Sequence, residues 1–164
     1  MHELFDKKIM DRVRDFLVKR GESIAVAESV TSGLLQLALA SASDAMQFYQ
    51  GGITTYNLGQ KSRHLHVEPI HALSCHCVSP QVASEMALNV CTLFGSSWGI
   101  GVTGYASPVP ESDNKLYCHY AIAHKSKIVL ADKIVGQRNE PFKVQHKYAE
   151  ILLADLARYL GRTK

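Results

Sequence analysis

The sequence has no uninterrupted apolar stretch of membrane-spanning length, so we expect no membrane partner. Residues 1–20 carry charges at helical spacing, which predicts no secretory signal there. The chain has only four cysteines, and they form no short disulfide framework, which favours reduced thiols and a cytoplasmic location. The net charge of +3 comes without a block of lysine and arginine, so nucleic acid is not an expected partner.

Helical and strand patterns alternate along the chain, which predicts a single domain over residues 1–164. Helical spacing of apolar residues occurs in residues 5–17, 34–40, 80–93 and 144–159, and strand-like runs occur in residues 23–27, 51–56, 98–104, 116–123 and 127–135. The last two runs predict an antiparallel hairpin. The order of elements predicts an α/β fold, a three-layer α/β/α sandwich around a mixed sheet of about five strands.

The composition changes abruptly from apolar to polar within residues 25–33. A buried strand would end here and a helix would begin near residue 34, with Glu28, Ser29, Thr31, Ser32 and Gly33 in the connecting turn. The first N–H groups of a helix lack an acceptor within the helix and can face an anion or a developing oxyanion. Ser29 would be well placed for nucleophilic attack. In the alternative interpretation, Thr31 or Ser32 merely caps the helix.

A second strand-to-helix transition follows at residues 51–61. Asn57 ends the predicted strand and is expected to cap a helix that contains Lys61. Lys61 would lie about one turn into that helix, near Tyr56 at the end of the strand. Ser79 followed by Pro80 predicts another helix start, with the serine as cap and the proline at the first helical position.

These segments resemble, in order, the motifs of the CinA C-terminal domain family, which includes stand-alone nicotinamide mononucleotide deamidases. Residues 27–33, Ala-Glu-Ser-Val-Thr-Ser-Gly, resemble the family's Ala-Glu-Ser-Cys-Thr-Gly-Gly. Residues 51–57 with Lys61 are similar to Gly-Gly-Val-x-x-Tyr-Ser-Asn-x-x-Lys, and residues 103–108 are similar to Thr-Gly-Ile-Ala-Gly-Pro. The spacing is kept from Glu28 to Lys115, so the resemblance covers most of the chain.

The resemblance implies an amidohydrolase that converts nicotinamide mononucleotide to nicotinate mononucleotide and ammonia, without a metal or cofactor. On the matching positions, Ser29 would be the nucleophile, with Lys61 and Tyr56 serving proton transfer and positioning. A desolvated lysine of lowered pKa can activate a serine. The implied substrate-binding residues are Glu28, Thr31, Ser32, Gly33, Thr103, Gly104 and Arg138. The resemblance also implies a homodimer or a higher homo-oligomer.

The sequence departs from the family pattern most clearly in residues 107–114. Ser107 replaces a glycine, and Val109, Pro110 and Glu111 occupy the place of a glycine-rich segment. Proline lacks an N–H donor, and Glu111 would repel a phosphate. An alternative function is therefore a catalytically impaired paralogue that keeps the fold but binds a different ligand or a protein partner.

Residues 64–77 contain an unusual density of potential metal ligands: His64, His66, His71, Cys75, His76 and Cys77. These residue types suit zinc, although their spacing matches no standard structural zinc site. We expect a histidine-rich surface helix and loop here, and no metal site.

Overall fold

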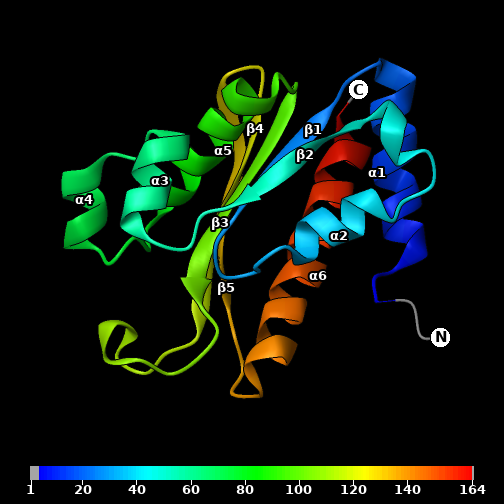
Figure 1. The fold of residues 1–164 in the computed structure, drawn as a ribbon. Coiled ribbons are helices and arrows are strands. Elements are labelled where there is room, and N and C mark those ends of the chain that lie inside the picture. Colours follow the sequence, from blue (N-terminus) through cyan, green and yellow to red (C-terminus); the bar gives the residue numbers. More distant parts are fainter. Residues whose placement is uncertain (1–3, 164) are drawn as a thin grey trace.

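The computed structural model describes residues 4–163, in which a five-stranded sheet lies between two layers of helices (Figure 1). The helices are α1 (Lys7–Arg20), α2 (Leu34–Ala40), α3 (Leu58–Leu65), α4 (Pro69–Ser74), α5 (Pro80–Phe94) and α6 (Pro141–Arg162). The strands are β1 (Ile24–Glu28), β2 (Tyr49–Thr54), β3 (Trp98–Tyr105), β4 (Tyr117–His124) and β5 (Lys127–Val135). Short 3-10 helices occur at η1 (Ala45–Gln47) and η2 (Pro110–Ser112). Within residues 4–163, no helix is long and apolar enough to cross a membrane.

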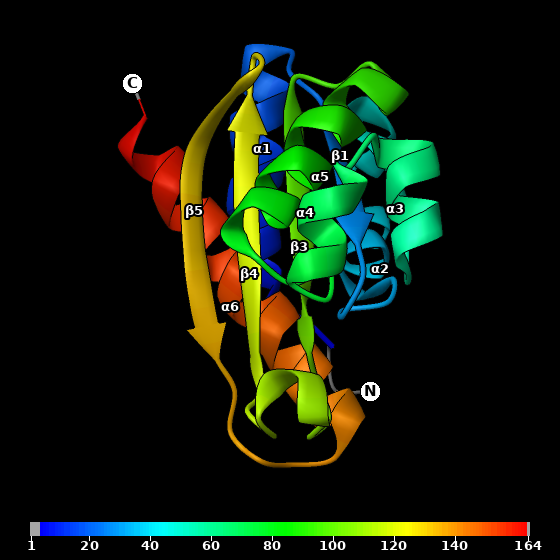
Figure 2. The ribbon, with the colours of Figure 1, turned by 90° about the vertical axis from the view of Figure 1, so that its left-hand side faces the viewer.

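The sheet is mixed, with the strand order β2-β1-β3-β4-β5. Strand β1 pairs in parallel with both β2 and β3, whereas β4 is antiparallel to β3 and to β5. Figure 1 shows α3, α4 and α5 on one face and α1, α2 and α6 on the other, and Figure 2 shows β5 at the edge. The predicted three-layer α/β/α sandwich and the predicted hairpin of β4 and β5 are both confirmed.

Strand β1 lies between two covered faces, and all of its residues are buried. Ile24 and Val26 belong to the apolar cluster formed with α1, α2 and α6. Ala25 and Ala27 belong to the cluster formed with α3 and α5. Side chains alternate between the two faces of a strand. Successive residues of β1, and those that follow Ala27, therefore point in turn toward one helical layer and then the other.

Glu28 at the end of β1 turns toward α2 and caps that helix. Its buried carboxylate accepts hydrogen bonds from the N–H groups of Leu35 and Gln36, the second at 3.2 Å. A carboxylate at this position satisfies free N–H groups and interacts favourably with the helix dipole. The N-cap position itself is Gly33, with a φ of 100° and no side chain to contribute. The alternative in which Thr31 or Ser32 caps α2 is therefore wrong.

Close packing between β3 and α5 depends on Gly101. A Cβ atom there would lie 2.5 Å from the backbone nitrogen of Ala87 and would press against the carbonyl oxygen of Ala83. We therefore expect Gly101→Ala to lower the free energy of unfolding by about 2–3 kcal/mol, because the strand and the helix backbone must separate. Denaturant unfolding measures this change.

Gly161→Ala provides the matched control for Gly101→Ala. No atom lies within 4 Å of a Cβ built on Gly161, near the end of α6. Alanine favours the helical conformation, so this variant should be neutral or slightly more stable than the wild type. Equal loss of stability in the two variants would contradict the packing argument.

Candidate active site

A cavity of about 550 Å³ lies where β1 and β3 end and the chain leaves the sheet. The carboxyl ends of parallel strands are the usual location of ligand sites in open α/β sheets. The cavity is lined by residues from several connections of the chain. They are Ser29 and Val30 in the β1–α2 turn, Tyr56 and Lys61 in the α3 region, and His76, Cys77 and Val78 in the α4–α5 connection. The end of β3 and the loop after it add Thr103, Gly104, Tyr105, Ala106, Ser107, Val109 and Glu111, and α6 adds Pro141 and Gln145. We call residues 106–116 the β3–β4 loop; this loop and the beginning of α6 line the same cavity and lie at the same end of the molecule (Figures 1 and 2).

Ser29 and Lys61 meet at the buried end of this cavity. The Lys61 ammonium Nζ donates hydrogen bonds to Ser29 Oγ at 2.9 Å and to the backbone oxygen of Thr55 at 2.8 Å. The exposed fraction is 1% for Lys61 and 7% for Ser29. The predicted pairing of the β1–α2 turn with the lysine of α3 is therefore present as a direct contact.

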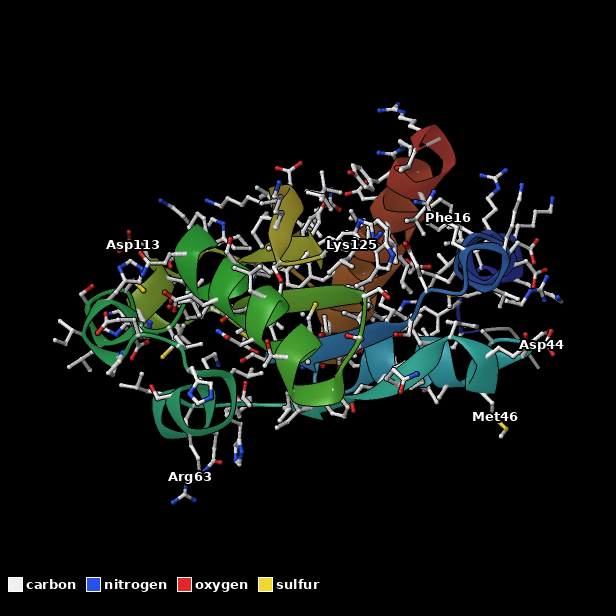
Figure 3. The ribbon with its side chains drawn as sticks, turned by 90° about the horizontal axis from the view of Figure 1, so that it is seen from above. Phe16, Asp44, Met46, Arg63, Asp113 and Lys125 are labelled. Atoms are coloured by element: carbon white, nitrogen blue, oxygen red, sulfur yellow. The ribbon has the colours of Figure 1, made fainter. Side chains whose placement is uncertain are left out.

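Helix α3 directs Lys61 inward because of how the helix begins. The Asn57 side chain caps it by accepting the N–H of Gln60 at 3.1 Å, which confirms the predicted cap. Lys61 then lies one turn into the helix, on its buried face. Arg63 is on the same helix but exposed, and Figure 3 shows it pointing away from the body of the protein.

Burial sets the protonation behaviour of Lys61. Desolvation lowers the pKa of its ammonium from 10.5 to about 8, while the nearby Cys77 thiol acts in the opposite direction. Removing a charged group from water favours its neutral form. An uncharged Lys61 amine is therefore accessible near pH 8, and it can accept the Ser29 hydroxyl proton across their hydrogen bond.

Thr103 fixes the opposite wall of the cavity. Its hydroxyl donates a hydrogen bond to the backbone oxygen of Cys77 at 2.7 Å, which ties the α4–α5 connection to β3. His76 and Cys77 adopt left-handed backbone conformations with φ values of 51° and 63°. Since the Thr103 hydroxyl hydrogen is already used, this side chain can offer a ligand only an acceptor.

The remaining predicted site residues divide into two groups. Gly104 lines the cavity, and Tyr56 lies at its rim with 78% of its surface exposed. The other predicted site residues, all within the described chain, do not line the cavity: Glu28, Thr31, Ser32, Gly33 and Arg138. Glu28 and Thr31 are buried, whereas Ser32 and Arg138 are exposed. A substrate-binding role for these five residues stays a prediction.

Several residues of the site were not identified from the sequence. The Thr55 backbone oxygen holds Lys61, and Tyr105 and Gln145 line the cavity. No sequence pattern marks a single carbonyl as a hydrogen-bond acceptor. Gln145 reaches the cavity only because the β5–α6 connection brings the beginning of α6 beside the β3–β4 loop (Figure 2).

The histidine and cysteine side chains of residues 64–77 are spread over separate contacts. His71 Nε2 lies 2.8 Å from Ser79 Oγ and 3.7 Å from Cys75 Sγ. His64 contacts Gln60, and His76 lines the cavity. Over the part of the chain that the structure describes, no three histidine, cysteine or acidic side chains come together as a possible metal-binding group.

The chain is similar to known proteins of one family. Residues 6–160 match the model of the CinA C-terminal domain. A CinA-like protein from Picosynechococcus is 34% identical over 152 residues, which cover 91% of this chain and 33% of that protein. A CinA-like protein from Prochlorococcus marinus is 39% identical over 111 residues, which cover 67% of this chain and 26% of that protein. The chain thus spans a quarter to a third of the length of these curated relatives.

Solved structures match the whole fold. The competence damage-inducible protein A (ComA) from Klebsiella pneumoniae superposes with a TM-score of 0.88 at 25% identity, covering 96% of this chain and 98% of that chain. The competence/damage inducible protein CihA from Agrobacterium tumefaciens also gives a TM-score of 0.88, at 22% identity and with the same coverage of 96% and 98%. The second likeness concerns the fold alone.

Proposed function

Because this chain belongs to the CinA C-terminal domain family, we propose that it is an amidohydrolase acting on nicotinamide mononucleotide and related pyridine carboxamides, with Ser29 as the nucleophile. The products are the corresponding carboxylate, nicotinate mononucleotide for the nucleotide, and ammonia. The observation that carries the proposal is the hydrogen bond of 2.9 Å between Lys61 Nζ and Ser29 Oγ at the buried end of the cavity. A serine beside a desolvated amine is a common arrangement for nucleophilic catalysis.

The reaction proceeds in two steps. In the first, Ser29 Oγ attacks the carboxamide carbon while neutral Lys61 takes the hydroxyl proton. Lys61 then returns this proton to the departing nitrogen, so the C–N bond breaks, ammonia leaves and an ester remains on Ser29. In the second, water attacks the ester with Lys61 again as base, which releases the carboxylic acid and restores the Ser29 hydroxyl.

Cys77 also lines the cavity, but we assign the nucleophile to Ser29. Burial raises the pKa of the Cys77 thiol, with Lys61 acting in the opposite direction, and a protonated thiol is a poor nucleophile. The Ser29 hydroxyl, by contrast, is in direct hydrogen-bond contact with the base. Thr103 Oγ1 can accept a hydrogen bond from the substrate NH₂ group, and Tyr56 at the rim can contact the ring.

The proposal predicts a specific pH dependence of ammonia release. Below about pH 8, the value to which burial lowers the pKa of Lys61, the rate should rise about tenfold per pH unit because the neutral amine is the active form. Above that pH it should reach a plateau. The measurement is ammonia release from nicotinamide mononucleotide at saturating substrate between about pH 6 and pH 9.5, and a flat profile over this range would contradict the role of Lys61.

The second candidate function is binding without catalysis, by a paralogue that keeps the fold. The observation that favours it is the β3–β4 loop, where the exposed Glu111 lines the cavity and Pro110 precedes it in η2. Ligand binding without any Ser29-dependent ammonia release at high protein concentration would support this candidate and reject the amidohydrolase.

A further inference from the structure

The charged groups of the cavity are distributed unevenly between its two ends. Lys61 at the buried end already donates to Ser29 and to Thr55 and is almost completely buried. At the outer end, Glu111 of the β3–β4 loop is the lining carboxylate. Within residues 4–163, no arginine and no lysine other than Lys61 lines the cavity. The outer end therefore presents negative charge without a matching cation.

A phosphate dianion requires the opposite environment. Phosphate sites in proteins are built from arginine or lysine side chains and from free backbone N–H groups, often at the first turn of a helix. The first turn of α6 reaches the cavity through Pro141. Proline at this position has no N–H group to donate.

The beginning of α6 also carries a carboxylate. Glu140 occupies the N-cap position, its backbone oxygen accepts the N–H of Val144 at 3.2 Å, and its carboxylate pairs with Lys143 at 3.4 Å. Lys143, a cation on this turn, is therefore already paired. Glu111 on the facing loop adds a second carboxylate, so a phosphate here would meet like charges.

The cavity also suits a cationic ring. Tyr56 and Tyr105 both line it, and aromatic faces attract cations. Burial, together with the neighbouring Tyr117 and Glu111, raises the pKa of Tyr105 to about 12, so its hydroxyl stays neutral at physiological pH. Glu111 and Tyr105 line the same cavity. A pyridinium ring between these groups would have its positive charge compensated.

We infer that Glu111 makes this cavity selective for a cationic N-ribosyl pyridinium carboxamide that carries no phosphate, over the corresponding mononucleotide. This inference rests on the proposed amidohydrolase function for the position of the carboxamide beside Ser29. The phosphate-free substrate has a net positive charge, whereas the phosphate makes the mononucleotide net negative. Glu111 attracts the first and repels the second, and it acts on binding without touching the reacting atoms.

Binding to Ser29→Ala protein tests this inference without turnover. Nicotinamide riboside and nicotinamide mononucleotide are titrated by calorimetry at about pH 8, where the phosphate of the mononucleotide is a dianion. We expect the riboside to bind about fivefold or more tightly than the mononucleotide. Glu111→Gln should reduce this ratio to near unity by strengthening mononucleotide binding, and added salt should also reduce the ratio.

Asp113→Asn is the matched control for Glu111→Gln. Asp113 belongs to the same loop, is exposed, and does not line the cavity (Figure 3). Neutralising it should leave the ratio of the two affinities unchanged. Circular dichroism checks that each variant remains folded.

Three results would overturn the inference: tighter binding of the mononucleotide by Ser29→Ala protein, an affinity ratio unaffected by Glu111→Gln, or no binding of either compound. Failure of the proposed function has a different signature, namely the absence of Ser29-dependent ammonia release from both compounds. Binding with the expected preference but without ammonia release would reject the amidohydrolase and retain the selectivity of Glu111.

Discussion

Ser29→Ala should reduce ammonia release from the carboxamide substrate by about a thousandfold or more, because the hydroxyl that Lys61 contacts by a hydrogen bond belongs to Ser29. Ser29 is buried, with an exposed fraction of 7%, but alanine removes only its hydroxyl oxygen. We therefore expect the fold to be retained. The measurement is ammonia release by purified protein at high enzyme concentration. Loss of turnover with retained ligand binding would separate the chemical role of Ser29 from a structural one.

Ser43→Ala is the control for this substitution. Ser43 is an exposed serine in the connection after α2, and it does not line the cavity. Its removal should leave turnover unchanged. Turnover by Ser29→Ala at the rate of Ser43→Ala would show that the Ser29 hydroxyl is not the nucleophile.

Lys61→Met should abolish turnover and at the same time stabilise the fold. Methionine has a similar length and fills the same buried space without a charge. The lowering of the Lys61 pKa from 10.5 to about 8 corresponds to a cost of about 3 kcal/mol for burying the ammonium at neutral pH. Loss of the hydrogen bonds to Ser29 and Thr55 offsets part of that gain. We expect a net increase of about 1–2 kcal/mol in the free energy of unfolding at pH 7.

The stabilisation by Lys61→Met should depend on pH in a defined direction. The folded-state pKa of Lys61 is lowered to about 8, whereas the unfolded chain keeps the ordinary value of 10.5. Between these values the unfolded state binds more protons, so wild-type stability rises with pH across this window. The advantage of the methionine variant is therefore complete below about pH 8 and shrinks as the pH approaches 10.5. Denaturant unfolding at pH 7 and near pH 10 measures the difference.

Arg63→Met is the matched control for Lys61→Met. It removes a cation from the same helix, but from a side chain that points away from the body of the protein (Figure 3). Neither activity nor the pH dependence of stability should change. A methionine at position 61 that destabilised the protein at pH 7 would contradict the assigned cost of burying the ammonium.

The sequence predicted the fold well where local signals agree with tertiary packing. The Ser79-Pro80 helix start is present at α5, with Ser79 accepting the N–H of Val82 at 3.1 Å. The last helix was predicted to begin near Val144 but begins at Pro141, because proline is favoured at the first helical position. Apolar periodicity cannot detect that turn, since its first residues do not face the core.

The candidate site was predictable in part. Short-range patterns placed Ser29 in a turn and Lys61 one turn into a helix, and the family resemblance related the two positions. The role of Glu28 was not predictable, since a carboxylate that caps a helix across a turn looks the same in sequence as one that binds a ligand. The contribution of α6 to the cavity depends on the path of the chain after β5, which no local pattern determines.

The most direct test of the account is peptide mapping by mass spectrometry of protein quenched in acid during turnover of the carboxamide substrate. We expect an acyl group, derived from the substrate, on the peptide that contains Ser29, and its absence from Ser29→Ala protein. An acyl group on Cys77, or continued ammonia release with no modification of Ser29 at any time point, would contradict the assignment of Ser29 as the nucleophile activated by Lys61.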